Sequence, residues 1–186
     1  MHIRRFLLKD IVYFDIETQK SADEVGGWSN IRLMRLAVAV AYSTQNGEYS
    51  VYLEKDAPGL VNQLKEADLV VGFNVKRFDY TVITPYTDFP LDKLPTLDML
   101  EGIYRTLGFR VSLDKLASAT LSEKKLADGL QSVRWYKQGK IDKIIEYCQK
   151  DVEITKRLHE YGCERGFVYF IGRRGVKRRI PVNWKL

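Results

Sequence analysis

The chain has 186 residues, of which 45% are hydrophobic and 29% are charged, and its formal net charge is +6. This composition is typical of one globular domain with a sizeable core, and we expect that domain to span residues 1–186. No run of roughly 18 apolar residues is present, and the N-terminal segment does not have the pattern of a secretory signal. We therefore exclude a membrane span and expect a protein of the cytoplasm or nucleoid.

Cysteine and histidine usage excludes two further kinds of site. Cys148 and Cys163 have no CxxC partner, and the chain holds only two histidines, so a Cys/His zinc site is not expected. Both cysteines are predicted to be small apolar residues on a helix. A nucleophilic arrangement would have to use His159, and no nearby residue supports one.

The hydrophobic pattern predicts the following elements in chain order. Strands are expected over short, mostly apolar or β-branched runs: 11–17, 35–42, 49–53, 68–73 and 166–171, the last of them pairing with 176–182. Helices are expected where start and stop signals frame a longer segment. Two are expected over 57–66 and 141–161, and a third is expected to begin with Asn74 as its cap and run to about Tyr86. Two more are expected, one that ends at Gly108 and one that starts at Ser112. This order predicts a mixed sheet with helices on its faces.

The first strand ends in two acids that are difficult to explain as structural residues. Asp15 and Glu17 are one residue apart, and alternation along a strand makes both side chains point the same way. Two like charges close together on one face repel each other. Neutralisation by a bound cation would relieve that repulsion.

Two more acids lie at positions where the pattern predicts burial. Asp151 is on the apolar side of the 141–161 helix, with Tyr147 one turn earlier. A salt bridge explains Asp151 as well as a metal does. Asp79 follows a buried strand, and taken alone it is better explained as an acid in the first turn of a helix. Together, the four carboxylates predict a site for two hard cations, Mg²⁺ or Mn²⁺, about 3.5–4 Å apart.

Three sequence motifs resemble those of the DEDD exonuclease superfamily, whose fold is ribonuclease H-like. They are DIET (15–18), NVKRFD (74–79) and YCQKD (147–151), in the family's order. The third is the tyrosine form, DEDDy, because the histidine form would need a histidine where Glu146 stands. The motifs are most similar to the proofreading-type exonuclease domain of family B DNA polymerases and its stand-alone prokaryotic relatives. In true ribonucleases H the catalytic glutamate lies on a helix after the hairpin, not two residues after the first aspartate. Cleavage inside RNA–DNA hybrids is therefore disfavoured.

The resemblance implies a fold, an activity and residue roles. The fold would be α/β and ribonuclease H-like, with a mixed central sheet flanked by helices. The activity would be 3′–5′ exonucleolytic hydrolysis of single-stranded DNA or RNA ends to 5′-mononucleotides. Asp15 would contact both cations, Glu17 and Asp151 the first and Asp79 the second, while Tyr147 would orient the attacking water.

Substrate contacts are expected from residues that match or neighbour the motifs. Thr18 and Asn74 match family positions near the terminal nucleotide, and Trp28 could stack on a base or pack in the core. Phe73 and Phe78 are expected in the core, and Asp98 as a helix cap. A basic C-terminal extension, about 172–186, is predicted to follow the phosphate backbone.

Two alternatives remain open beside the exonuclease. One is a catalytically inactive ribonuclease H-like module that binds nucleic acid or a protein, and the other is a phosphodiesterase for short oligonucleotides. The four acids and the tyrosine favour activity, and the positive charge favours longer nucleic acids. A role in proofreading or DNA repair would need a polymerase or helicase partner.

Overall fold

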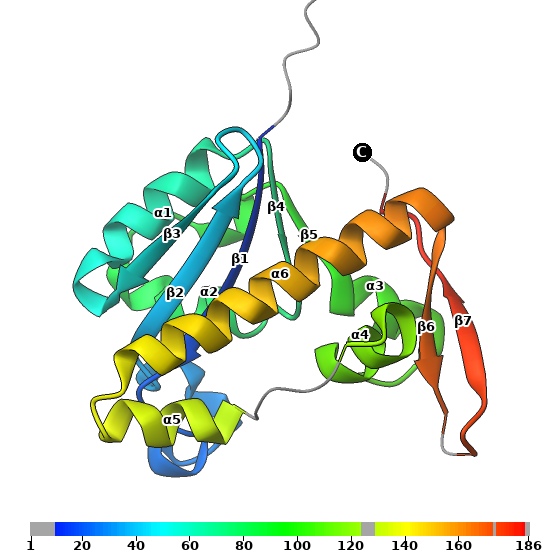
Figure 1. The fold of residues 1–186 in the computed structure, drawn as a ribbon. Helices are drawn as coiled ribbons and strands as arrows, with labels where there is room; N and C mark the ends of the chain where they lie inside the picture. Colours follow the sequence, from blue (N-terminus) through cyan, green and yellow to red (C-terminus); the bar gives the residue numbers. More distant parts are fainter. Residues whose placement is uncertain (1–9, 124–128, 173, 185–186) are drawn as a thin grey trace, which may run out of the picture.

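The computed structural model describes residues 10–123, 129–172 and 174–184. Within these residues a five-stranded mixed sheet, ordered β3-β2-β1-β4-β5, forms the centre of the domain (Figure 1). Its strands are β1 (Ile11–Thr18), β2 (Leu36–Ser43), β3 (Glu48–Leu53), β4 (Leu69–Gly72) and β5 (Thr96–Asp98). β1 pairs antiparallel with β2 and parallel with β4, so the predicted mixed sheet is confirmed.

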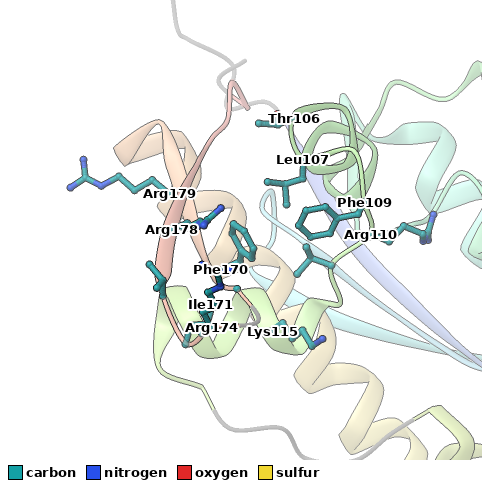
Figure 2. A pocket seen from close by; sticks show the side chains of 13 residues that line it. Thr106, Leu107, Phe109, Arg110, Lys115, Phe170, Ile171, Arg174, Arg178 and Arg179 are labelled. Atoms are coloured by element: carbon teal, nitrogen blue, oxygen red, sulfur yellow. The ribbon is translucent and has the colours of Figure 1, made fainter.

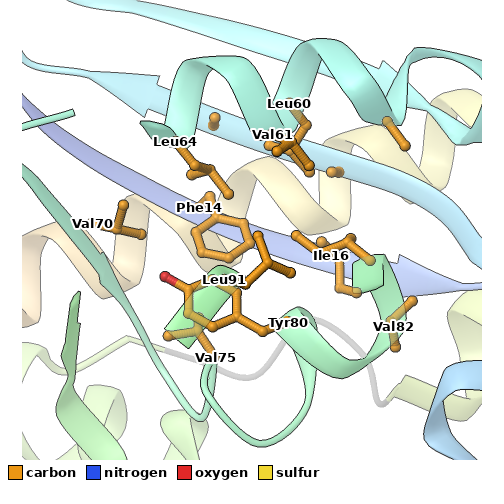
Figure 3. Packing of buried hydrophobic residues seen from close by; sticks show 14 of the residues in the cluster. Phe14, Ile16, Leu60, Val61, Leu64, Val70, Val75, Tyr80, Val82 and Leu91 are labelled. Atoms are coloured by element: carbon orange, nitrogen blue, oxygen red, sulfur yellow. The ribbon is translucent and has the colours of Figure 1, made fainter. Parts of the chain in front are cut away.

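Helices cover both faces of this sheet, which is why β1 and β2 are buried on both sides. Its helices are α1 (Ala57–Glu66), α2 (Asp79–Ile83), α3 (Met99–Leu107), α4 (Leu113–Leu121), α5 (Gly129–Lys137) and α6 (Ile141–Arg165). Neighbouring residues of β1 face opposite cores. Phe14 packs with Leu60 of α1 (Figure 3), whereas Tyr13 packs in the second core with residues of α6.

The helix ends follow the capping signals in most places. Asp98 caps α3, accepting hydrogen bonds from the backbone amides of Leu100 and Glu101, as predicted. Gly108 ends α3 in the left-handed conformation, and Ser112 caps α4. α6 was predicted from its apolar stripe, and its 25 residues cross one face of the sheet diagonally (Figure 1).

The prediction that Asn74 caps a helix was wrong. α2 begins only at Asp79, and Asn74 adopts a left-handed backbone conformation with φ of 70°. The chain leaves β4 in a tight turn, where a Cβ on Gly72 would lie 2.1 Å from a Val75 methyl group. In this turn the Asn74 amide donates a hydrogen bond of 2.9 Å to the Asp98 carboxylate, so the turn and the start of α3 share one acid.

A second, two-stranded sheet follows α6. β6 (Phe167–Ile171) and β7 (Lys177–Pro181) pair antiparallel, which confirms the predicted pairing. Thr120 of α4 exchanges hydrogen bonds with the backbone of Tyr169, and Trp184 packs against Gly162 of α6. The described part of the predicted basic extension therefore forms the turn, the second strand and the docked end of a hairpin. Residues 173, 185 and 186 of that extension lie outside the described residues.

Among the described residues, no helix combines the length and the apolar character needed to span a membrane.

Candidate active site

Two acids of the site come from β1. Asp15 and Glu17 are separated by one residue in a strand that pairs regularly with β2 up to Glu17. Their side chains therefore leave the same face of the sheet. The pairing with β2 is irregular between Glu17 and Thr18, so the strand ends its regular ladder at the acidic pair.

The long helix α6 brings the third acid to the same place. One carboxylate oxygen from each of Asp15, Glu17 and Asp151 lies within 4.8 Å of the other two. Residue 151 is more than 130 positions from residue 15 in the sequence, so this meeting depends on how α6 packs on the sheet. The structure thus brings together three of the four predicted carboxylates.

The fourth acid, Asp79, lies close to the other three but outside that 4.8 Å group. Its charge is the second largest cause, after burial, of the raised pKa of Asp15. The Asp79 side chain is only 2% exposed, and among the described residues its Oδ1 atom has no hydrogen-bond partner. A buried carboxylate oxygen without a partner is costly and marks a position where a ligand can bind.

Burial, with added repulsion from nearby carboxylates, raises the pKa values of Asp15, Glu17 and Asp79. The pKa of Asp15 lies well above its usual value. Burial is the main cause, and the charges of Asp79, Asp151 and Glu17 raise it further. Burial raises the pKa of Glu17 to about 8, against a hydrogen bond from Ser132 that lowers it. Burial also raises the pKa of Asp79 to about 8. Without a cation, the protein therefore favours the protonated form of these carboxyl groups.

Tyr147 lies one helical turn before Asp151 and is almost completely buried. Its ring packs edge-on against Trp135 of α5, with ring centroids 6.2 Å apart. Burial, followed by the charges of Asp151 and Glu17, raises the pKa of the Tyr147 hydroxyl. The hydroxyl therefore stays protonated and can donate a hydrogen bond beside the acids.

Two residues that sequence reasoning missed hold the acids of β1 in place. The Ser132 hydroxyl of α5 donates a hydrogen bond to Glu17 Oε2. Cys148 of α6 donates from Sγ to the Asp15 backbone carbonyl at 3.2 Å and to Asp15 Oδ2 at 3.6 Å. Cys148 is buried among apolar residues, as predicted, but it also contacts the site. The position of Cys148 directly after Tyr147 could have indicated that it contacts the site, whereas nothing in the sequence around Ser132 indicated this.

The other cysteine and the histidine are structural. His159 Nδ1 lies 2.8 Å from the Tyr13 hydroxyl, and Cys163 Sγ lies 3.3 Å from His159 Nε2. Cys163 also donates to the Trp184 backbone carbonyl, so this group ties the chain after β7 to α6.

Two of the residues predicted to contact substrate, Trp28 and Asn74, line one hollow. Trp28 is 64% exposed, so the alternative that it packs in the core was wrong. It lines a hollow of about 290 Å³ together with Asn74, Phe78 and Arg110, and Arg110 donates a 2.6 Å hydrogen bond to Asn74 Oδ1. Phe78 is half-buried against the first core, and Phe73 against the second.

Thr18 has a different environment from Trp28 and Asn74. Its side chain is buried and donates a hydrogen bond of 2.9 Å to the Lys20 carbonyl. In the described structure, Thr18 therefore stabilises the loop after β1.

The donor set fits hard divalent cations. Asp15, Glu17 and Asp151 offer carboxylate oxygens at one point, and Asp79 adds a buried oxygen that has no partner in the described residues. Mg²⁺ and Mn²⁺ prefer such oxygen ligands. No lysine or arginine in the described residues forms an ion pair with Asp15, Glu17 or Asp79. Within that part of the chain, no basic side chain therefore neutralises these three carboxylates.

A solved structure has a similar fold. The family B DNA polymerase from the hyperthermophilic archaeon Pyrobaculum calidifontis matches with a TM-score of 0.65 and 17% sequence identity. The match covers 83% of this chain and 24% of the polymerase chain, so the chain spans about a quarter of that protein. At this identity the likeness shows the fold.

A search of curated protein sequences gave no match. A family model, in contrast, matches most of the chain. The model described as RNase_H superfamily matches residues 12–162, which include the acids of β1, α2 and α6. Nucleases of this fold use divalent metals and bind nucleic acid, in agreement with the acidic donor set. Because the match spans most of the sequence, the chain belongs to the RNase_H superfamily.

Proposed function

We propose that this chain is a metal-dependent 3′–5′ exonuclease of the DEDDy type, which hydrolyses single-stranded nucleic acid ends to 5′-mononucleotides. The observation that carries the proposal is the convergence of Asp15, Glu17 and Asp151 within 4.8 Å, beside the buried Asp79. The 3′–5′ direction rests on the resemblance of the three motifs to the DEDD exonucleases. The catalytic unit would be one domain over residues 1–186.

Four carboxylates would hold two divalent cations. Asp15 would contact both, Glu17 and Asp151 would complete the first site, and Asp79 would serve the second. When bound, such cations activate water and offset negative charge at the phosphate and the leaving 3′ oxygen. Burial, and then repulsion by Asp79, Asp151 and Glu17, raises the pKa of Asp15. This supports the role because a bound cation would offset that repulsion.

The protein's own groups would position the reactants. The hydroxyl of Tyr147 would donate a hydrogen bond to the attacking water and so orient it. Its raised pKa keeps the hydroxyl protonated for this role. Ser132 would hold the Glu17 carboxylate, and Cys148 the Asp15 carboxylate. Such positioning matters because a displacement of about 1 Å at a reacting group can cost about 10²-fold in rate.

The hollow lined by Trp28, Asn74 and Arg110 would hold the terminal nucleotide. The exposed ring of Trp28 offers a surface for base stacking, and Asn74 with Arg110 offers polar contacts to sugar or phosphate. Thr18 would act through the loop that it stabilises.

The proposal is tested by following 5′-labelled single-stranded DNA and RNA of one sequence with Mg²⁺ or Mn²⁺. Wild type should give a ladder that shortens from the 3′ end. Asp151→Ala should lose about 10²-fold or more in rate, and Tyr147→Phe about tenfold or more. Glu146→Ala, an exposed acid on the same helix, is the matched control and should cleave normally.

The contrary outcome is equally informative. If the folded wild type binds both strands but cleaves neither with either cation, the exonuclease proposal is wrong. The chain would then be a binding module with an inactive ribonuclease H-like fold.

A further inference from the structure

A second concave surface lies between the β6–β7 hairpin and the turn that joins α3 to α4. This groove has a volume of about 1160 Å³, and none of the four acids of the candidate active site lines it. Figure 2 shows Phe109, Arg110 and Lys115 on one side and Phe170, Arg174 and Arg178 on the other. We call it the hairpin groove, defined by these six residues.

The walls of the hairpin groove are fixed by packing. Thr120 of α4 accepts a 2.9 Å hydrogen bond from the Tyr169 amide of β6. Val168 of β6 and Ile180 of β7 are fully buried, so one face of the hairpin is part of the core. Phe170 and Arg178 pair directly across the strands and share this face, because side chains alternate along a strand.

The groove concentrates positive charge without an acidic partner. Its lining includes several cationic side chains and no aspartate or glutamate. Within residues 10–123, 129–172 and 174–184, no ion pair engages Lys115, Arg174 or Arg178. Like charges gathered in this way repel one another and attract a polyanion.

The outer face of the same hairpin is different. Lys177 lies 4.2 Å from the centre of the Tyr169 ring and does not line the groove. Arg179, which is also among the residues that line the groove, lies 4.4 Å from the centre of the Phe167 ring. Aromatic rings of the hairpin therefore engage these two cations. Lys177 and Arg178 are neighbours in sequence, but only Arg178 points into the groove.

The hairpin groove adjoins the hollow of Trp28 and Asn74 at a shared residue, Arg110. This residue lines the groove and also the hollow that contains Trp28 and Asn74. Beside it, Phe109 is 49% exposed and packs edge-on against Phe170, with ring centroids 5.9 Å apart. An exposed aromatic ring among unpaired cations is the surface that single-stranded nucleic acids bind, by stacking and by phosphate contacts.

We propose that the hairpin groove binds a single nucleic acid strand at nucleotides on the 5′ side of the terminal residue held near Trp28. The inference rests on the proposed function for the direction of the strand. The cations would contact phosphates, and Phe109 would stack on a base. A long strand would then reach both the hollow and the groove, whereas a very short one would reach only the hollow.

The test measures binding by fluorescence anisotropy with 5′-labelled oligothymidylate and oligouridylate in excess chelator. Strands of about 12 and about 4 nucleotides are compared, since single-strand sites span about 4–16 nucleotides. Arg178→Glu should lower the ratio of long-strand to short-strand affinity by about tenfold, and its loss of a phosphate contact should reduce the salt slope by about 0.7. Phe109→Ala should lower long-strand affinity by about fivefold or more.

Lys177→Glu is the matched control because it makes the same charge change one residue away on the outer face. It should alter long-strand affinity by about twofold at most, as expected for a solvent-screened charge on the other face of the strand. Lys115→Glu, on the opposite wall, should reproduce the effect of Arg178→Glu. Melting temperatures confirm that each variant is folded.

Each outcome decides between the proposals. Equal effects of Arg178→Glu and Lys177→Glu, or no effect of Lys115→Glu, would overturn the hairpin groove while leaving the exonuclease intact. Length-dependent binding through the groove, without any hydrolysis of either strand in Mg²⁺ or Mn²⁺, would overturn the exonuclease instead. Preferential binding of a duplex would overturn the single-strand assignment.

Discussion

The substitution Asp79→Asn should stabilise the metal-free protein, and the gain should grow with pH. Burial raises the pKa of Asp79 from 3.8 to about 8, with the charge of Asp98 adding to the rise. An acid with a raised pKa in the folded state binds its proton more tightly when folded. Wild-type stability should therefore fall as pH rises from about 4 to about 8 in the presence of chelator. Asparagine removes this loss because it does not ionise.

The size of the effect follows from the pKa difference. Each pH unit between 3.8 and the folded pKa costs about 1.4 kcal/mol, so ionisable Asp79 lowers stability by about 4 kcal/mol at pH 7. The new amide group must itself be buried, at a cost of about 1–3 kcal/mol. Near pH 8 the loss from ionisable Asp79 reaches about 5 kcal/mol, so we expect a net gain of about 2–4 kcal/mol there and little or none near pH 5.

Urea denaturation in chelator at about pH 5 and about pH 8 measures this difference. Asp92→Asn, at an exposed aspartate, is the control and should leave stability unchanged at both values. With Mg²⁺ added, Asp79→Asn should gain less stability than wild type, because a ligand is lost. A difference from wild type that does not depend on pH, or a variant less stable than wild type at the higher pH, would refute the reasoning.

Substitutions at three further positions test the site and its supports. Mg²⁺ or Mn²⁺ should raise the melting temperature of wild type, and Asp15→Asn should abolish most of that rise; an unchanged rise would place the cations elsewhere. Gly162→Ala puts a Cβ 2.3 Å from the Trp184 ring and should destabilise the protein by about 1–3 kcal/mol, with a red-shifted tryptophan emission; unchanged emission and stability would contradict the docking of the chain end. Ser132→Ala should lower kcat about tenfold with little change in KM, since only the orientation of Glu17 is lost, and Ser132→Thr should restore it; a change in KM alone would mean that Ser132 acts in substrate binding.

The sequence predicted the elements that carry strong local signals. β1 ends in an acidic pair, and α6 has a regular apolar stripe that Asp151 interrupts, so both elements were found with their acids. Asp98 was predicted as a cap because an acid before a helix accepts amide hydrogen bonds. These signals are local, and packing preserved each of them.

Other features depended on contacts between distant segments. Asn74 fits a helix cap and a left-handed turn equally well in sequence, and its amide bond to Asp98 across 24 residues selected the turn. Ser132 acts only because α5 packs against β1, and nothing in its local sequence indicates that contact. The exposure of Trp28 likewise reflects the path of the loop after β1. The hairpin groove joins segments at least 55 residues apart in the sequence, so it became visible only in the folded structure.

The most direct test of the central claim compares a linear single strand with its circular form. Both strands share one sequence, and both are incubated with wild type and Asp151→Ala in Mg²⁺ or Mn²⁺, with products identified by mass. We predict that wild type converts only the linear strand, from its 3′ end, to 5′-mononucleotides, and that Asp151→Ala leaves both strands intact. Cleavage of the circular strand, or equal hydrolysis by Asp151→Ala, would contradict an exonuclease built on the acids of β1, α2 and α6.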